Sequence, residues 1–340
     1  MIDELTDARS ILLIKLRAVG DVVLSTVVLK NLREALPQAE IDFLTEPAGA
    51  GVLEGNPLLA RTVVYDRRSM SGPGLIRLIR SRRYDAVIDL FCNPRTALVT
   101  RLSGARVRVG YRFRGRTYAY NTVVEPRGGE VHNTQFNLDA LVRIGVPIVD
   151  RSLHIVPGEP DEEKAGRILS ERRGRRIVAI NPGGGWTVKR WPLDRFARLA
   201  DMLIDELGVD ILLLWGPGEG EEIEWLRRGM KHRPLIPPAT KLLELAAILK
   251  RCWFMVSNDS GPMHIGAAMG IPVVGIFGPT NPHLQGPFGD QHQTVRNEEL
   301  PCLGCNLTEC PIGNPCMLEL SVERVMEAAR AMLHRNAMAR

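Results

Sequence analysis

The segment Ser257–His264, with the sequence Ser-Asn-Asp-Ser-Gly-Pro-Met-His, has residue types and spacing that suit the binding of an anion. It follows an expected strand and opens an expected helix, so the backbone N–H groups of Ser260–Met263 would be available to a phosphate. The Ser260 hydroxyl adds a donor, and Pro262 suits the first turn of a helix. His264 has two open interpretations, because it could contact a phosphate or pack in the core.

A second candidate loop, Asn181–Pro192, has the sequence Asn-Pro-Gly-Gly-Gly-Trp-Thr-Val-Lys-Arg-Trp-Pro and also follows an expected strand. Consecutive glycines let the backbone approach a ligand closely. The spacing differs from that of a Walker loop, which argues against a kinase-type P-loop. Lys189 is close enough in sequence to place its charge on a phosphate. A flexible turn with a surface lysine is the alternative.

Three acidic residues follow a third expected strand, in the run Trp-Gly-Pro-Gly-Glu-Gly-Glu-Glu that ends at Glu222. A carboxylate in this place could accept hydrogen bonds from ribose hydroxyls. Glu219 is the first candidate, and Glu221 and Glu222 are its rivals. The full G-x-G-x-x-G fingerprint of dinucleotide binding is absent. These acids could instead only stabilise the start of a helix.

Asp21 is the candidate general base. It follows Gly20 in the loop after the first expected strand, Ile11–Leu16. Its carboxylate could accept a proton from a substrate, or it could cap the helical pattern that runs from Asp21 to Leu36. The two roles partly exclude each other, because backbone N–H groups that bind a capping carboxylate lower its pKa.

Four of the six cysteines form a cluster near the C-terminal end: Cys302, Cys305, Cys310 and Cys316. Four thiolates suffice for a tetrahedral metal site, although this spacing is more compact than the usual two-knuckle zinc pattern. Reduced, partly buried thiols are the alternative, and a disulfide framework is not expected in a cytosolic chain.

No two aspartates have the Asp-x-Asp spacing with which many sugar-nucleotide enzymes hold a divalent metal. The negative charge of a bound diphosphate would therefore have to be neutralised by Lys189 and a helix N-terminus.

Arginines are concentrated between residues 61 and 118. The chain has 44 basic and 39 acidic residues and a net charge of +5, and 14 arginines but only 3 acids lie between residues 61 and 118. Arginine suits bidentate contact with phosphate or carboxylate, so a membrane surface, an acidic substrate or nucleic acid could bind there. A solvated arginine-rich surface is the alternative. Aromatic residues make up only 5% and no nucleic-acid-binding module is recognisable, which disfavours nucleic acid.

Short apolar strands alternate with helical patterns, which predicts an α/β fold of parallel sheets with helices on both faces. The length of 340 residues favours two doubly wound, Rossmann-like domains. We expect an N-terminal domain at 1–155, a linker region at 156–175, a second domain at 176–320 and a C-terminal helix at 321–340. Since ligands bind at the carboxyl ends of such strands, the central cleft between the domains is the expected active site. The lack of a spanning apolar run and of a signal-peptide pattern predicts a soluble, cytoplasmic protein.

Four segments in this order resemble the ADP-heptose:lipopolysaccharide heptosyltransferases of glycosyltransferase family 9. They are Lys15–Asp21, Lys189–Pro192, Asn258–His264 and Phe277–Thr280. The resemblance extends from Ile11 to about Arg330, and the stretch Cys316-Met-Leu-Glu-Leu is most similar to the heptosyltransferase II branch. It implies a two-domain GT-B fold whose second domain binds the nucleotide sugar.

The resemblance also implies a reaction, the inverting transfer of heptose from ADP-heptose to the inner core of lipopolysaccharide, with Asp21 as general base and no cofactor or catalytic metal. Lys189 would contact the diphosphate and Glu219 the ribose. The phosphates would be cupped by Asp259, Ser260, Gly261 and His264. Ser260 stands where many members have threonine, and it keeps the hydroxyl.

The implied acceptor is an anionic glycolipid of the inner membrane, so the protein would work at the cytosolic face as a peripheral protein. Its phosphates and carboxylates would meet the arginine-rich region, and the candidate contacts are Arg112, Arg114 and Arg116.

Three alternatives remain at this level. Another family 9 enzyme would use a different sugar donor or acceptor. An NAD-type Rossmann oxidoreductase has the same fold class but would need the missing fingerprint. A nucleic-acid-binding protein would account for the arginines but lacks a module signature.

Overall fold

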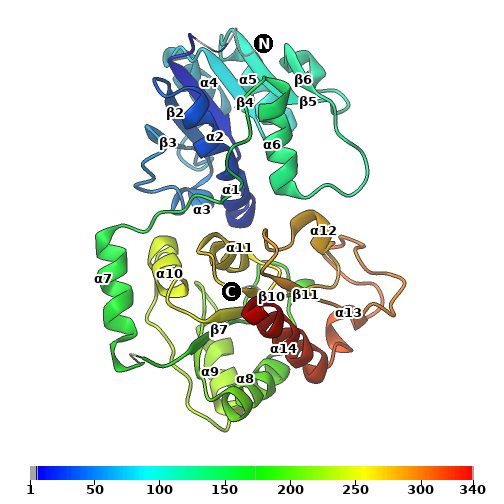
Figure 1. The fold of residues 1–340 in the computed structure, drawn as a ribbon. Helices are drawn as coiled ribbons and strands as arrows, with labels where there is room; N and C mark the ends of the chain where they lie inside the picture. Colours follow the sequence, from blue (N-terminus) through cyan, green and yellow to red (C-terminus); the bar gives the residue numbers. More distant parts are fainter. Residues whose placement is uncertain (1–4, 6, 173, 339–340) are drawn as a thin grey trace. The chain divides into compact units, whose positions relative to one another are not determined.

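The structure, a computed structural model, describes residue 5 and residues 7–172 and 174–338. The chain divides into two compact units, Met1–Val156 and Pro157–Arg340. Each unit contains one parallel sheet with helices on both of its faces (Figure 1). This arrangement confirms the predicted α/β class.

The first unit holds a six-stranded sheet of order β3-β2-β1-β4-β5-β6 in which all neighbours are parallel. The order reverses between β1 and β4. Residues of β1, β2 and β4 are nearly all buried, as expected for a parallel sheet with two covered faces, whereas the edge strand β3 is largely exposed. Its strands are β1 (Ser10–Ile14), β2 (Glu40–Thr45), β3 (Arg61–Val64), β4 (Ala86–Asp89), β5 (Val107–Tyr111) and β6 (Thr122–Val124).

Helices cover both faces of this sheet. Leu75 and Ile79 of α4 and Val99 of α5 pack with Leu12 and Ile14 in one core cluster. Helices α1, α2 and α6 contact one another. The helices of this unit are α1 (Val19–Ser25), α2 (Val27–Ala35), α3 (Pro47–Ala50), α4 (Gly72–Ser81), α5 (Pro94–Leu102) and α6 (Asn133–Arg143), with a 3₁₀ turn at Thr117–Ala119.

The helical pattern expected from Asp21 to Leu36 is two helices in the structure. The first begins at Val19 and ends at Ser25, and the second begins at Val27. Hydroxyls at the junction bond back to the preceding turn, with Ser25 donating to Val22 O at 2.8 Å and Thr26 to Val23 O at 2.7 Å. Such bonds compete with the helical ladder, which accounts for the break between the two helices. The apolar spacing continues across the break and therefore did not reveal it.

The second unit holds a five-stranded sheet of order β11-β10-β9-β7-β8, again with parallel neighbours. The order reverses between β7 and β9. Its strands are β7 (Ile177–Asn181), β8 (Asp210–Leu213), β9 (Phe254–Asn258), β10 (Val273–Ile276) and β11 (Gln293–Val295).

The helices of the second unit also lie on two faces. Side chains of α8, α9 and α14 share a cluster with Val256 and Val274, whereas Gly266 of α11 lies against Met255 and Val273, which point the other way along the same strands. The helices are α7 (Glu159–Ile168), α8 (Leu193–Leu207), α9 (Gly220–Gly229), α10 (Leu242–Leu249), α11 (Gly261–Ala268), α12 (Pro282–Gln285), α13 (Pro315–Leu318) and α14 (Val322–Met338), with 3₁₀ turns at Ser170–Arg172 and Thr187–Lys189.

Residues 156–175, expected as a linker region, mostly belong to the second unit. Helix α7 packs on α10, where Lys164 pairs with Glu244 at 2.7 Å and Glu162 pairs with Arg251 at 2.5 Å. The expected C-terminal helix is α14, and it packs on α8 and the sheet of the same unit. The division of the chain therefore lies between Val156 and Pro157.

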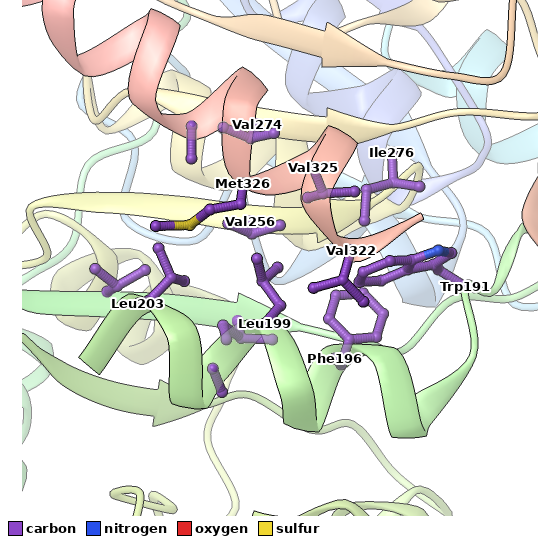
Figure 2. Close-up of a cluster of buried hydrophobic side chains, with 14 of the residues drawn as sticks. Trp191, Phe196, Leu199, Leu203, Val256, Val274, Ile276, Val322, Val325 and Met326 are labelled. Atoms are coloured by element: carbon purple, nitrogen blue, oxygen red, sulfur yellow. The ribbon is translucent and has the colours of Figure 1, made fainter. Parts of the chain in front are cut away.

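Figure 2 shows the core that joins α8 and α14 to the sheet of the second unit. Trp191 and Phe196 meet edge to face, with ring centroids 4.9 Å apart, and the Trp191 indole donates to Leu320 O at 2.9 Å. Leu199 and Met326 are fully buried between the two helices and the strands. This core fixes the loop that carries Trp191, which is two residues after Lys189.

We expect Leu199→Ala to lower the free energy of unfolding of the second unit by about 2–5 kcal/mol, because it leaves a cavity in a fully buried site. All five tryptophans lie in this unit, so tryptophan fluorescence during urea unfolding reports on it alone. Leu318→Ala, at a half-exposed position of the same unit, is the matched control and should cost under about 0.5 kcal/mol. Equal losses in the two variants would contradict the assignment of this core.

Among the residues that the structure describes, no helix combines the length and the apolar character needed to cross a membrane.

Candidate active site

The loops after β7 and β9 lie side by side where the strand order of the second sheet reverses, which is the usual ligand site of a doubly wound sheet. Two asparagines at the strand ends tie these loops together. Asn181 donates to the Ser260 hydroxyl at 2.8 Å, and Asn258 donates to Pro182 O at 2.6 Å. Asn258 Oδ1 also accepts from the backbone N–H of Trp191 at 3.1 Å. The segments that the sequence analysis singled out separately therefore form one site.

Lys189 places its charge at this site. Its ammonium lies 2.7 Å from Asp259 Oδ2 and 4.4 Å from the centroid of the Trp186 ring. The Thr280 hydroxyl donates to the same Asp259 oxygen at 2.7 Å. Asp259 is almost fully buried. A buried carboxylate that holds a lysine and a threonine orients the lysine, whereas the same carboxylate would repel a phosphate. The geometry favours a positioning role for Asp259, and its expected phosphate contact stays a prediction.

The N-terminus of α11 lies next to this lysine–aspartate pair. Ser260 is the N-cap residue, yet its hydroxyl makes no capping bond, since it binds Asn181 and donates to Asn258 O at 3.3 Å. Pro262 stands in the first turn, as predicted. The positive end of a helix dipole and backbone N–H groups beginning at Gly261 therefore face the same edge of the sheet as Lys189. His264 is buried in this helix, and its expected phosphate contact stays a prediction.

Glu219 lies between the loops after β7 and β8. Its carboxylate accepts from Gly216 N at 2.7 Å and from Gly184 N at 3.3 Å. A side chain at Gly183 would clash with it, because a Cβ there would lie 2.5 Å from both carboxylate oxygens. A side chain at Gly183 would therefore displace the Glu219 carboxylate, a relation that the sequence did not reveal.

Arg190 distinguishes the three candidate acids. It pairs with Glu222 through two contacts of 2.9 Å, and it approaches Glu219 at 3.5 Å. Glu221 is exposed on the outer side of α9. Arg190 therefore neutralises the charge of Glu222. The carboxylate of Glu219 lies instead against the loop after β7, at the point where the second sheet reverses its order.

Asp21 lies in the first turn of α1, the helix that follows β1, beside the point where the first sheet reverses its order. It is the third residue of α1 and not its N-cap, which is Ala18. Its Oδ2 atom accepts from the backbone N–H of Ala18 at 3.0 Å. The carboxylate thus reaches back to the N-cap residue with one oxygen and remains partly exposed. The general-base and capping interpretations both remain compatible with this geometry.

Lys15 lies beneath the start of α1. It was named above only as the first residue of the segment Lys15–Asp21. It is 7% exposed, and its ammonium donates to Leu90 O at 3.1 Å, in the loop after β4. Burial lowers the pKa of Lys15, while the charge of nearby Asp21 opposes that shift.

Asp89 at the end of β4 shapes the neighbouring loop. Its carboxylate accepts from the backbone N–H of Cys92 at 2.8 Å and from the Tyr120 hydroxyl at 2.8 Å. Full burial raises the pKa of Asp89. Its place inside the protein makes it a structural group of this loop.

The three candidate arginines differ in their surroundings. Arg112 forms an exposed pair with Glu125 at 2.6 Å. Arg116 donates to Cys92 O at 3.2 Å and lies 5.8 Å from the centroid of the Phe113 ring, while Arg114 is exposed. Arg116 is the one that the structure brings to the loops at the switch point of the first sheet.

The four clustered cysteines line one pocket of about 90 Å³, here called the cysteine pocket: Cys302, Cys305, Cys310 and Cys316. All are free thiols. Burial and the charges of the other three thiols together raise the pKa of Cys316 to about 11. Over the described ranges, no group of three or more His, Cys, Asp or Glu side chains is arranged so that it could hold a metal ion.

Four side chains that build the site at the β7/β9 switch point were not predicted from the sequence: Asn181, Arg190, Asn258 and Thr280. Asn181 and Asn258 could have been found as polar residues at the ends of otherwise apolar strands. Arg190 and Thr280 lie inside quoted motifs, but their partners are distant in sequence.

The chain matches the family model described as glycosyltransferase family 9 (heptosyltransferase) over residues 74–315, which is more than half of its length. The two Rossmann-like sheets match the GT-B fold of the solved heptosyltransferase structures. The chain belongs to glycosyltransferase family 9.

Comparisons with individual proteins agree with this family. Lipopolysaccharide heptosyltransferase 3 of Escherichia coli strain K12 is 28% identical over 281 residues, which are 77% of this chain and 80% of that protein. The crystal structure of the family 9 glycosyltransferase from Veillonella parvula superposes with a TM-score of 0.84 at 27% identity, over 97% of this chain and 98% of that one.

The E. coli heptosyltransferase WaaC, in a structure with ADP-2-deoxy-2-fluoro heptose, has the same fold, with a TM-score of 0.74 at 20% identity over 95% of this chain and 99% of that one. Curated relatives carry the names heptosyltransferase 1, 2 and 3, so the assignment to the heptosyltransferase II branch stays a prediction.

Proposed function

We propose that this glycosyltransferase moves a heptose from ADP-heptose to the inner core of lipopolysaccharide, with inversion at the anomeric carbon. The observation that carries the proposal is the site at the β7/β9 switch point, where Lys189 and the N-terminus of α11 lie together. Two positive groups at one place suit a diphosphate. The family membership and the ADP-sugar bound by WaaC support heptose as the sugar and adenosine as the nucleoside.

In the proposed reaction, the acceptor hydroxyl oxygen attacks the anomeric carbon from the face opposite ADP. Its proton passes to the carboxylate of Asp21 as the bond from the anomeric carbon to the diphosphate oxygen breaks. Negative charge then grows on the leaving ADP, where Lys189 and the backbone N–H groups that follow Ser260 stabilise it. Asp259 and Thr280 hold Lys189 in place for this task. These fixed charges let the reaction proceed without a divalent metal on the diphosphate.

Glu219 is the proposed ribose ligand, so we expect Glu219→Gln to weaken ADP binding about tenfold, equivalent to ~1.4 kcal/mol. The carboxylate accepts hydrogen bonds from hydroxyls more strongly than the amide does. Glu221→Gln, at an exposed position two residues away, is the matched control and should bind ADP like the parent protein. Calorimetric titration with ADP measures both, and a loss confined to the Glu221 variant would overturn the assignment.

The proposed acceptor is an anionic glycolipid that the protein meets at the cytosolic face of the inner membrane. Replacing Arg112, Arg114 and Arg116 together by alanine should raise the acceptor KM about tenfold or more and change kcat less, because charge-assisted contacts to the acceptor are lost. A triple alanine variant at Arg167, Arg198 and Arg228, exposed on helices of the second unit, removes the same charge and should keep the parent KM. An unchanged acceptor KM in the first triple variant would move the acceptor site elsewhere.

Titration with ADP, NAD and duplex DNA tests the class of ligand. Trp186 stacks on Lys189, so tryptophan fluorescence should respond to a ligand at this site. We expect saturable binding of ADP, weaker binding of NAD, and no binding of DNA at moderate salt. Tight binding of NAD, or salt-dependent binding of DNA without ADP binding, would instead support the corresponding alternative.

A further inference from the structure

The outer side of α5 exposes apolar side chains where a solvent-facing helix usually has polar ones. Leu98 is 43% exposed and Leu102 is 37% exposed. They are four residues apart, so they lie on the same side of the helix, and the exposed Arg101 lies beside them. The opposite side is buried, and its Val99 packs in the core with the first sheet. Two leucines and an arginine thus form the outer stripe of α5.

The 3₁₀ turn at Thr117–Ala119 extends this stripe. The turn contacts α5, and Tyr118 at its centre is 58% exposed. A tyrosine has an apolar ring and a polar hydroxyl, which together suit the boundary between water and lipid. The exposed residues of the stripe and the turn are called the α5 surface below: Leu98, Arg101, Leu102 and Tyr118.

The segment that carries the α5 surface has only positive charges. Residues 90–124 contain seven arginines and neither aspartate nor glutamate. Burial and, after it, the charge of Arg101 lower the pKa of Arg108, so these two guanidinium groups lie within electrostatic reach of each other. The apolar side chains of the surface are therefore embedded in a field of one sign.

Backbone carbonyls hold two of these arginines in place. Arg108 donates to Ala119 O at 3.1 Å and to Ala105 O at 2.7 Å. Arg116 donates to Cys92 O at 3.2 Å. A carbonyl oxygen orients a guanidinium group without neutralising it, so both positive charges are retained beside the α5 surface.

The charge and the small apolar area together indicate what this surface fits. A stable protein–protein interface buries at least ~1,200 Å² around an apolar centre, more than three partly exposed apolar side chains supply. A two-fold contact between copies of this chain would bring the same arginines together, and they would repel. A bilayer with anionic lipids offers phosphates to the arginines and an apolar boundary to the leucines and the tyrosine.

The α5 surface lies next to the loops at the switch point of the first sheet. Strand β4 ends at Asp89 and α5 begins at Pro94, so the helix starts at the carboxyl edge of the sheet. The bond from Arg116 to Cys92 O ties the segment before the 3₁₀ turn to the same loop. A membrane at this surface would therefore lie near the edge of the sheet that holds Asp21.

We propose that the α5 surface docks the protein on a bilayer that contains anionic lipids. Leu98, Leu102 and Tyr118 enter the headgroup boundary, and the arginines around them bind lipid phosphates. The reason for docking rests on the proposed function, in which the acceptor is a glycolipid of the same membrane. The docking itself needs neither donor nor acceptor, so it can be measured without the transfer reaction.

Co-sedimentation of the full-length protein with vesicles tests the docking. One set of vesicles is made of phosphatidylcholine and the other of phosphatidylcholine mixed with phosphatidylglycerol. We expect at least about tenfold stronger binding to the mixed vesicles, and we expect high salt to weaken it. Equal binding to the two sets, or binding to neither, would overturn the proposal.

A double variant tests the position of the surface. Leu98→Glu combined with Leu102→Glu removes two apolar side chains and adds charges that the lipids repel, so binding to the mixed vesicles should fall at least about tenfold. Val142→Glu combined with Val149→Glu is the matched control, at exposed positions of the same unit outside the α5 surface, and should bind like the parent protein. Equal losses in both double variants would overturn the proposal, because they would follow from net charge alone.

Tyr118→Trp gives a second measurement that keeps the surface intact. All native tryptophans lie in the second unit, so the added indole reports on the first. In mixed vesicles whose lipids carry bromine near the headgroup, we expect more fluorescence quenching in this variant than in the parent protein. Quenching no greater than that of the parent protein would overturn the proposal.

Activity separates a failure of docking from a failure of the proposed function. Transfer to an acceptor freed of its acyl chains should be unchanged in the Leu98/Leu102 variant, whereas transfer to the acceptor in mixed vesicles should fall at least about tenfold. Equal transfer in vesicles by the parent protein and this variant would overturn the docking. Docking without any heptose transfer would contradict the proposed function alone. A parent dimer that the variant dissociates would assign the surface to a contact between copies and overturn the proposal.

Discussion

Asp21→Asn should lower kcat by about 10²–10⁴ and leave the affinity for the sugar nucleotide unchanged. The amide oxygen of asparagine can still accept the hydrogen bond from the Ala18 N–H group, so the start of α1 is preserved. What is lost is the carboxylate that would take the acceptor proton. Steady-state kinetics with calorimetric donor binding separates these two effects.

Asp85→Asn is the matched control for this experiment. Asp85 also accepts backbone hydrogen bonds, from Arg9 at 2.8 Å and Ser10 at 3.0 Å, but it lies at the amino end of the first sheet. We expect its variant to keep the parent kcat. A near-parental rate in Asp21→Asn would show that Asp21 serves α1 as a helix-stabilising acid and that another group takes the proton.

Lys189→Met should weaken ADP binding by about 10–100-fold and lower kcat/KM by about 10²–10³. The loss in kcat/KM is larger because the charge on the leaving ADP grows during the reaction, so the ammonium is worth more in the transition state than in the bound donor. ADP titration and initial rates measure the two quantities. Lys231→Met, an exposed lysine of the same unit, should leave both unchanged.

A double-mutant cycle with Asp259→Asn tests the role assigned to Asp259. The Lys189 ammonium lies 2.7 Å from Asp259 Oδ2. If Asp259 acts through Lys189, replacing Asp259 should change ADP affinity and kcat/KM little further once Lys189 is methionine. Effects that simply add would contradict the positioning role and return Asp259 to a separate contact with the donor.

Much of the fold could be predicted from the sequence because buried parallel strands are short apolar runs. The strand expected at Ile11–Leu16 is β1, which runs from Ser10 to Ile14. Strands β6 and β11 were not predicted, since three residues such as Thr122–Val124 are too few to display a period. Helix α6 was also missed, because polar residues such as Thr134 and Asn137 interrupt its apolar face.

The candidate site could be predicted only as a set of loops. Strand ends and glycines located the loops, but the partner of each side chain depends on how distant segments meet. The pairing of Lys189 with Asp259 joins residues 70 positions apart. The preference for Glu219 over Glu222 as the ribose ligand depends on Arg190, because Arg190 forms an ion pair with Glu222. Neither relation has a local pattern from which it could be deduced.

The most direct test of the account is the release of ADP from ADP-heptose in the presence of a defined lipopolysaccharide core acceptor, without added divalent metal. We predict ADP release that requires the acceptor, matches the heptose transferred one for one and is lost in Lys189→Met. No acceptor-dependent release from ADP-heptose, combined with transfer from a different nucleotide sugar, would contradict the assigned donor.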